Sequence, residues 1–262
     1  MTLGQKLTQF ALIIEYDGGN YHGFQLQANE STVQAELERA LEKLTGKTTR
    51  VAGASRTDAG VHAMGQVVSF RTGSTLTAQT FTSGLNYYLP LDIAVRAAYR
   101  MPDGFRVRSD AVNREYNYYI LNRRTRSPLE RRYSCRVAAG LDVDSMNRAC
   151  QALIGQHDFG SFATALGPEV KSTVRRIYRA GVNKEGDMVT LNMVASSFLT
   201  HQVRNTAGTL IRVGLGKMTL AEFSSIMEAE KPGLAGPAAE AGGLCLMKVN
   251  YRQPLSGENE NI

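Results

Sequence analysis

The spacing of hydrophobic residues divides the chain into short strands and helices. A continuous apolar run over residues 10–16 predicts a buried strand, and apolar side chains three and four apart over residues 33–44 predict a helix after it. Ser31 and Gln34 have the spacing of a capping box that would begin this helix, and Gly46 is a typical residue for its end. The chain therefore starts with a strand followed by an amphipathic helix.

The pattern continues in the same way through the first 100 residues. Strands are predicted over 48–55, 65–72 and 92–100, and a helix over 77–89 that Pro90 closes. With the first two elements this gives the order β-α-β-β-α-β, which is typical of a ferredoxin-like layer of helices on a sheet.

A second set of elements follows a polar stretch at residues 103–113. It comprises a strand over 116–122, a helix over 142–155, a hairpin over 172–184 and 187–196, helices over 198–216 and 220–229, and a strand over 243–251. We therefore predict an α+β protein with two ferredoxin-like halves, residues 1–108 and 109–262. The halves would form a central mixed, mainly antiparallel sheet with a cleft between them.

Composition narrows the class of protein. The chain has 262 residues, of which 43% are hydrophobic, so it can bury a sizeable core, and it has no apolar run long enough to cross a membrane. Its first ten residues lack the apolar stretch of a signal peptide, so we expect a cytosolic protein. The three cysteines and four histidines are scattered, and we expect neither a metal site nor a disulfide framework.

The positive charge is concentrated in one segment. The net charge is +6, and residues 111–136 hold seven arginines against two glutamates. Arginine contacts phosphates and the tyrosines of this segment can stack on bases, so the composition indicates nucleic acid. A solvated loop that keeps the protein soluble would have the same composition.

The stretch ASRTDAGVHAMGQVVSF, residues 54–70, places Asp58 in a loop between two predicted strands. An aspartate two residues before Gly60 is typical of an Asx turn, in which the side chain accepts a backbone N–H. Arg56 and Thr57 supply more polar chemistry than such a turn requires. A functional loop is therefore the second interpretation.

Two further stretches mix polar residues with an apolar pattern. In the predicted helix over 198–216, Arg204 lies one position off the apolar stripe, where an arginine is usually a solvated charge. Its glycines, Gly208, Gly214 and Gly216, are costly in a helix and predict close approach of another chain segment.

In REYNYYI, strand alternation puts Tyr116 and Tyr118 on one face and Asn117 and Tyr119 on the other. A core position is an ordinary one for a strand tyrosine.

Six stretches together are similar to one known family. They are YDGGNYHGFQLQ (16–27), SRTDAGVHAMGQV (55–67), LNYYLPLDIAV (85–95), REYNYYI (114–120), HDFGSF (157–162) and HQVRNTAG (201–208). Their order and spacing resemble those of the TruA family of tRNA pseudouridine synthases over nearly the whole chain. The chain departs from the usual family pattern at Phe24, commonly tryptophan, at Ser55, commonly glycine, and in GPAAEAGGLCL (236–246).

This resemblance implies an isomerase that converts uridine to pseudouridine at positions 38, 39 and 40 of tRNA, in the anticodon arm, without metal or organic cofactor. It implies that Asp58 is the catalytic carboxylate, which would attack as a nucleophile or stabilise positive charge at C1′ while the glycosidic bond breaks. Arg204 would keep this carboxylate ionised in a dry pocket, and Tyr116 would lie against the uracil. The family also implies a homodimer with one tRNA across both subunits.

A base within a stem must flip out before it can react, so the enzyme needs RNA contacts that offset the cost. We expect these contacts to read shape and backbone, and Arg56 to contact the backbone or to fill the space that the base leaves. The residues expected to contact RNA are Arg56, His62, Arg114, Tyr116, Arg123 and Arg124. Three alternatives stay open: a non-catalytic RNA-binding protein, a glycosidase or base-exchange enzyme, and a pseudouridine synthase of another RNA.

Overall fold

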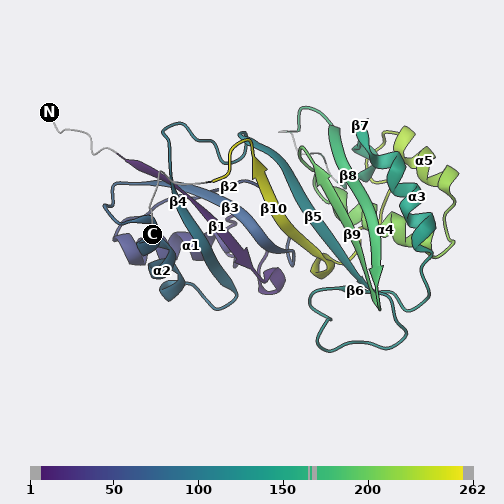
Figure 1. Ribbon diagram of the computed structural model, residues 1–262, viewed down its shortest axis with the longest axis horizontal. Helices are drawn as coiled ribbons and strands as arrows, with labels where there is room; N and C mark the ends of the chain where they lie inside the picture. Colours follow the sequence, from purple (N-terminus) through teal and green to yellow (C-terminus); the bar gives the residue numbers. More distant parts are fainter. Residues whose placement is uncertain (1–6, 165, 167–169, 256–262) are drawn as a thin grey trace. The chain divides into compact units, whose positions relative to one another are not determined.

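The computed structural model describes residues 7–164, 166 and 170–255 (Figure 1). The chain divides into two compact units: unit 1 is Met1–Val112 with Leu246–Ile262, and unit 2 is Asn113–Cys245. The last strand therefore groups mostly with unit 1, although it follows unit 2 along the chain. The predicted division into an N-terminal domain, residues 1–108, and a C-terminal domain, residues 109–262, stays a prediction.

Unit 1 has the predicted β-α-β-β-α-β order. Its elements are β1 (Thr8–Tyr16), the 3-10 turn η1 (Gly18–Asn20), α1 (Val33–Thr45), β2 (Ala52–Gly53), β3 (His62–Thr72), α2 (Ala78–Tyr88), β4 (Ile93–Met101) and most of β10 (Leu244–Tyr251). The sheet order is β4-β1-β3, with β2 and β10 both paired to β3, and β1 is antiparallel to each of its neighbours. This is the arrangement expected for a ferredoxin-like layer.

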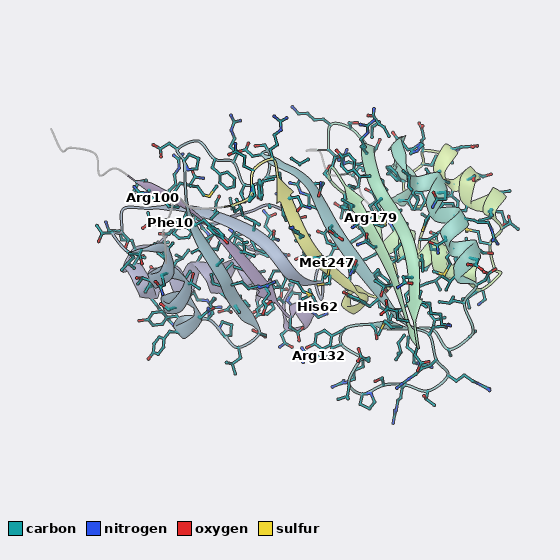
Figure 2. All side chains as sticks on the ribbon, in the orientation of Figure 1. Phe10, His62, Arg100, Arg132, Arg179 and Met247 are labelled. Atoms are coloured by element: carbon teal, nitrogen blue, oxygen red, sulfur yellow. The ribbon has the colours of Figure 1, made fainter. Side chains whose placement is uncertain are left out.

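Alternating side chains of β1 and β3 face the helices and form the core of unit 1. The ring of Phe81 on α2 packs 4.8 Å from that of Phe10 and 5.2 Å from that of Phe70, as ring-centroid distances, and α1 lies beside α2 (Figures 1 and 2). Edge and tilted aromatic contacts of this kind add to the stabilisation that burial of apolar area supplies. The cluster fixes the helices on one face of the sheet.

Two details of unit 1 correct the sequence prediction. The N-cap of α1 is Thr32 and not Ser31, because the Thr32 hydroxyl accepts from the backbone of Ala35 while the Gln34 side chain turns away and accepts from Leu26. The predicted strand over 48–55 is also wrong in length, since β2 covers only Ala52–Gly53. Beyond it the Gln66 side chain bonds both the N–H and the C=O of Ser55, which replaces strand pairing there.

Unit 2 repeats the layering with a different set of elements. They are β5 (Ala111–Leu121), β6 (Cys135–Arg136), α3 (Val143–Leu153), β7 (Gly155–Asp158), η2 (Gly160–Phe162), β8 (Val174–Glu185), β9 (Met188–Ala195), α4 (Gln202–Gly214), α5 (Leu220–Glu228) and η3 (Ala241–Gly243). The sheet order is β5-β9-β8-β7 with antiparallel pairs, and β6 pairs in parallel with β5. The prediction of a mixed, mainly antiparallel α+β fold is confirmed, whereas β6 and β7 are too short to leave a pattern in the sequence.

Helix α4 begins later than predicted. His201 is its N-cap with a left-handed φ of 61°, so residues 198–201 turn into the helix instead of forming it. The predicted close approach is confirmed at Gly208, where a Cβ would lie 2.6 Å from the carbonyl oxygen of Pro237, and at Gly214, which faces Met146. It is wrong at Gly216, which has nothing within 4 Å and instead has a positive φ of 67° just beyond the helix end. Within the described part of the chain, no helix has the length and apolar character needed to span a membrane.

Candidate active site and RNA-contact residues

The Asp58 loop connects β2 to β3 in unit 1. Asp58 is half-buried, and its backbone carbonyl accepts from Val61 N at 3.1 Å, which closes a turn in which Gly60 has a φ of 77°. Thr57 is buried, and its hydroxyl lies 2.8 Å from the hydroxyl of Tyr16 on β1. These hydrogen bonds fix the backbone around Asp58, so the point from which its carboxylate projects is defined.

The loop rests directly on the turn that follows β1. A Cβ at Gly18 would lie 1.9 Å from the carbonyl oxygen of Val61, and one at Gly23, where φ is 88°, would lie 2.6 Å from that of Thr57. The N–H of Phe24 donates to the same Thr57 carbonyl at 3.1 Å. The stretches 16–27 and 55–67 thus meet backbone to backbone, a contact that the sequence analysis missed and that the glycines of DGGNYHG could have indicated.

His62 starts β3 and is 5% exposed (Figure 2). Its Nδ1 lies 3.0 Å from the N–H of Gly18 and 3.1 Å from a carboxylate oxygen of Asp17. These contacts join the Asp58 loop to the η1 turn, and they favour a role in holding the loop. The predicted RNA contact of His62 stays a prediction.

Arg56 is exposed and comes two residues before Asp58. It lines a hollow of about 280 Å³ together with Arg108, which belongs to the turn between β4 and β5. Burial, and next the charge of Arg56, lower the pKa of the Arg108 guanidinium from its ordinary value. Arg108 was not among the residues expected to contact RNA, since nothing in its local sequence distinguishes it from Arg106.

In unit 2 the predicted alternation along β5 is confirmed. Tyr116 and Tyr118 are buried on one face, and the ring of Tyr116 lies edge-on to that of Phe198 with the centroids 5.3 Å apart. On the other face Asn117 donates to the hydroxyl of Tyr119 at 3.1 Å. One face of β5 therefore carries buried aromatic rings, and the other carries hydrogen-bonding side chains.

Arg204, on α4, is half-buried and anchored by a segment far along the chain. Its Nε donates to the carbonyl of Ala239 at 2.8 Å, and the N–H of Ala239 donates back to the Arg204 carbonyl at 3.1 Å. Tyr118 donates its hydroxyl to the next carbonyl, that of Glu240, at 2.9 Å. Burial dominates and raises the pKa of Tyr118 well above its usual range, although the nearby Arg204 charge opposes this, so the phenol stays protonated. The segment 236–246 was noted for its departures from the family pattern but not as the support of Arg204.

The structure places the three arginines of residues 111–136 that were expected to contact RNA in different surroundings. Arg114 is 6% exposed and its guanidinium donates to the carbonyl of Ser196, so it ties β5 to the end of β9. Arg123 folds onto its own loop by donating to the carbonyls of Thr125 and Arg126. Arg124 is exposed. Of the three, Arg124 fits a direct RNA contact best, and all three remain predictions.

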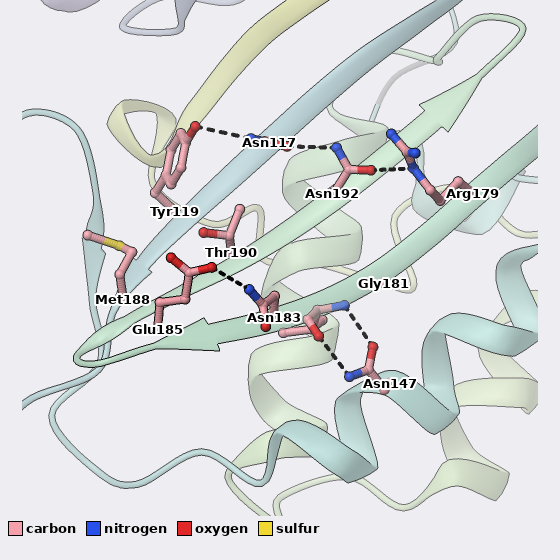
Figure 3. Close-up of a pocket in the computed structure, with 11 residues that line it drawn as sticks. Asn117, Tyr119, Asn147, Arg179, Gly181, Asn183, Glu185, Met188, Thr190 and Asn192 are labelled. Atoms are coloured by element: carbon pink, nitrogen blue, oxygen red, sulfur yellow. Dashed lines mark hydrogen bonds between the residues drawn. The ribbon is translucent and has the colours of Figure 1, made fainter.

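A second hollow, of about 460 Å³, lies on the face of the unit 2 sheet that bears Asn117 and Tyr119 (Figure 3). A chain of hydrogen bonds crosses it: Asn192 donates to Asn117 at 2.8 Å and accepts from Nε of Arg179 at 2.8 Å. Arg179 and Asn192 also both donate to one oxygen of Glu115 at 2.8 Å. The polar groups of this hollow therefore satisfy one another.

The possible metal ligands and the cysteines were compared among the described residues. Among them, no group of three or more His, Cys, Asp or Glu side chains could hold a metal ion. The cysteines Cys135, Cys150 and Cys245 are free and buried, and burial raises the pKa of Cys150 to about 12. These thiols are packing residues.

The fold and the Asp58 loop define an α+β protein whose first unit presents a carboxylate on a rigid loop. The family model described as tRNA pseudouridine synthase matches residues 12–110 and 149–252. Curated relatives named tRNA pseudouridine synthase A include those of Geobacter sp. (strain M21), 44% identical over 92% of this chain and 97% of its own, and of Exiguobacterium sp. (strain ATCC BAA-1283 / AT1b), 40% identical over 94% and 99%. The chain belongs to the tRNA pseudouridine synthase family.

A solved structure titled "Crystal Structure of a Cbf5-Nop10-Gar1 Complex" aligns over 91% of this chain and 58% of that one, with a TM-score of 0.35 and 10% identity. That likeness is too weak to bear on fold or function.

Proposed function

We propose that this protein isomerises uridine to pseudouridine in tRNA, at positions 38, 39 and 40 of the anticodon arm, with Asp58 as the catalytic carboxylate. Membership of the tRNA pseudouridine synthase family supports the reaction and the substrate class. The observation that carries the residue assignment is the Asp58 loop, whose backbone is held on the turn at residues 17–24 by contacts that leave no room for side chains. We keep a cytosolic location as part of this proposal.

The reaction needs one group that can act at the sugar of the target nucleotide. The C1′–N1 bond must break, the uracil must turn while it is held, and its C5 must bond to C1′. A carboxylate can attack as a nucleophile or stabilise the positive charge that develops at C1′. A half-buried aspartate on a fixed loop can fill either role, because both roles need a carboxylate that is held in a defined position near C1′.

The supporting residues act on that carboxylate and on the base. We infer that Arg204 faces Asp58 and keeps it ionised when RNA closes the site, since an unpaired carboxylate away from water is strongly disfavoured. The bonds between Arg204 and Ala239 support this role by fixing the side chain along α4. We infer that Tyr116 lies against the uracil and assists removal of the C5 proton, and its edge contact with Phe198 would hold the ring in place.

The RNA itself must deform to react. A base in a stem flips out at a cost of a few kcal/mol, which phosphate contacts by arginine offset. We propose that Arg56 and Arg124 make such contacts, because both are exposed. We also propose a homodimer that carries one tRNA across both subunits. Light scattering should give twice the mass of the 262-residue chain, and a single-chain mass would contradict the dimer.

The decisive experiment compares wild type with Asp58→Asn, which keeps the shape of the side chain and removes its charge. Pseudouridine at positions 38–40 is mapped in unmodified tRNA after incubation with each protein. We expect the variant to be slower by a factor of at least about 10³, because a nucleophile or charge-stabilising group is lost. Asp103→Asn serves as the control, because it makes the same chemical change at an exposed position of unit 1, outside both the loop and the turn at residues 17–24.

Each alternative has its own outcome in that experiment. Full-rate conversion by Asp58→Asn would exclude Asp58 as the catalytic group. No conversion by the wild type, with tight RNA binding, would support a non-catalytic RNA-binding protein. Free uracil among the products would support a glycosidase or base-exchange enzyme, and pseudouridine only at other sites or in another RNA would correct the substrate.

A further inference from the structure

The hollow beside the Asp58 loop differs from an ordinary surface depression in its charge. It holds about 280 Å³ and lies entirely within unit 1. Among the described residues that line it are two arginines, Arg56 and Arg108, and no carboxylate. Gln25 adds an exposed amide at its edge. The lining therefore offers hydrogen-bond donors that suit an anion.

The floor of the hollow is rigid. Phe24 is 2% exposed and its ring covers Gly53 of β2 so closely that a Cβ there would lie 2.5 Å from the ring. The Gln34 side chain, also in the lining, is committed to the carbonyl of Val51 at 3.2 Å and to Glu38 at 2.8 Å. The buried ring is not available for stacking, so the hollow does not suit a base.

Arg108 is carried by a turn that is held in place from two sides. The carbonyl of Phe105 accepts from the side chain of Gln9 at 2.6 Å, and that of Val107 accepts from the hydroxyl of Tyr251 at 2.7 Å. The rings of Phe105 and Tyr251 also pack with centroids 5.4 Å apart. A guanidinium on such a turn loses less freedom on binding a ligand than one on a mobile loop.

Two positively charged side chains line this one hollow, which favours an anion as its ligand. Burial, and next the charge of Arg56, lower the pKa of the Arg108 guanidinium, in keeping with the two groups lining the same hollow. A phosphate group between them would accept a charge-assisted hydrogen bond from each. Arginine suits this task because its planar fork matches the geometry of phosphate oxygens.

We infer that this hollow binds a phosphodiester group of the substrate RNA, gripped between Arg56 and Arg108 at the side of the Asp58 loop. The inference rests on the proposed function for its ligand, since a tRNA that reaches Asp58 brings its backbone past Arg56, two residues away. It adds Arg108 as an RNA-binding residue and makes the hollow a backbone contact instead of a base pocket.

The test measures RNA binding separately from conversion. Arg108→Gln and Arg106→Gln are each placed in the Asp58→Asn background, and their affinity for an unmodified tRNA transcript is measured at several salt concentrations. Arg106 is the matched control, because it is exposed on the same turn, outside the hollow, and it bonds Asp110 through its backbone N–H and C=O and not through its guanidinium. We expect Arg108→Gln to weaken binding by roughly 10-fold and to lower the salt slope by about 0.7–0.9, with no change for Arg106→Gln.

Two further variants separate a specific grip from general charge. Arg108→Lys should keep the salt slope but recover only part of the affinity, because a lysine lacks the fork. Combining Arg56→Gln with Arg108→Gln should cost less than the two single losses together, since both side chains hold one phosphate. With Asp58 intact, the Arg108→Gln defect in conversion should lie mainly in KM.

The outcomes distinguish this inference from the proposed function. Equal RNA affinity of the Arg108→Gln and Arg106→Gln proteins, with both folded by circular dichroism, would overturn the inference and leave the reaction untouched. If Arg108→Gln kept its RNA affinity but lost thermal stabilisation by inorganic phosphate, the hollow would bind a free phosphate ion and the RNA assignment would be wrong. A defect in RNA binding without any pseudouridine formation by the wild type would support the hollow and refute the enzyme.

Discussion

The hollow in unit 2 and the hollow beside the Asp58 loop differ in the charge and the hydrogen bonding of the side chains that line them. In unit 2, Figure 3 shows the hydrogen bonds that join Arg179, Asn192 and Asn117, and Arg179 and Asn192 also both donate to Glu115 beside the hollow. In unit 1, the hollow beside the Asp58 loop brings two arginines together without a carboxylate in its described lining. The larger hollow is thus lined by amides and an arginine that bond to one another, and the smaller by two guanidinium groups whose charge an anion would complement.

We assign binding to the smaller hollow because of its charge, so volume is not what distinguishes the two. The volume of a hollow depends on where side chains leave space, whereas the ligand that it can bind depends on the donors, acceptors and charges that line it. A network whose members satisfy one another contributes to the stability of a sheet face.

The largest effect is expected from breaking the support of the Asp58 loop. Gly23→Ala would put a Cβ 2.6 Å from the Thr57 carbonyl at a φ of 88°. We expect a loss of about 1–3 kcal/mol in unfolding free energy beyond the backbone cost, and roughly 100-fold lower activity because Asp58 is displaced. Urea unfolding and pseudouridine formation by the same preparations measure both.

Gly104→Ala is the matched control for that substitution. Gly104 has a φ of 90° and nothing within 4 Å, so its replacement bears the backbone cost alone, about 1–2 kcal/mol. If the Gly23 and Gly104 variants lost the same stability and the same activity, close packing under the Asp58 loop would have no role in catalysis.

The order of elements and the face of each β5 tyrosine could be predicted from the sequence, because both depend on local periodicity. The support of the site could not. Gly18 meets Val61, and Arg204 meets Ala239, only after residues far apart in the chain have folded together. Local chemistry also gave a wrong prediction at the start of α1: Ser31 and Thr32 are both good N-cap residues, and in the structure it is the Thr32 hydroxyl that accepts from the N–H of Ala35.

The candidate site residues also differ in how much of their role could be predicted from the sequence. Asp58 and Arg56 lie in one short motif, so their loop could be recognised from residue types and resemblance alone. His62 and Arg114 belong to comparable motifs, yet the fold buries both, at 5% and 6% exposure, against backbone partners. Burial depends on the packing of whole units, which a motif does not contain.

A smaller effect is expected from opening the network of unit 2. Asn192→Ala removes hydrogen bonds to Asn117, Arg179 and Glu115, and we expect a loss of about 1–2 kcal/mol in unfolding free energy with unchanged pseudouridine formation. Asn183→Ala on the neighbouring strand, whose side chain bonds Glu185, should cost less than about 0.5 kcal/mol. Lower activity of Asn192→Ala at unchanged stability would mean that this face engages the RNA, and the contrast between the hollows would fail.

The smallest effect on stability is expected at Arg108. Arg108→Gln changes an exposed side chain, so the unfolding free energy should stay within about 0.5 kcal/mol of the wild-type value at low and at high salt. Chemical denaturation at low and high salt measures this. If Arg108 serves RNA binding and not folding, its replacement should leave the unfolding free energy of the RNA-free protein unchanged. A substantial loss of stability would instead make Arg108 a structural residue and would place the two hollows in the same class.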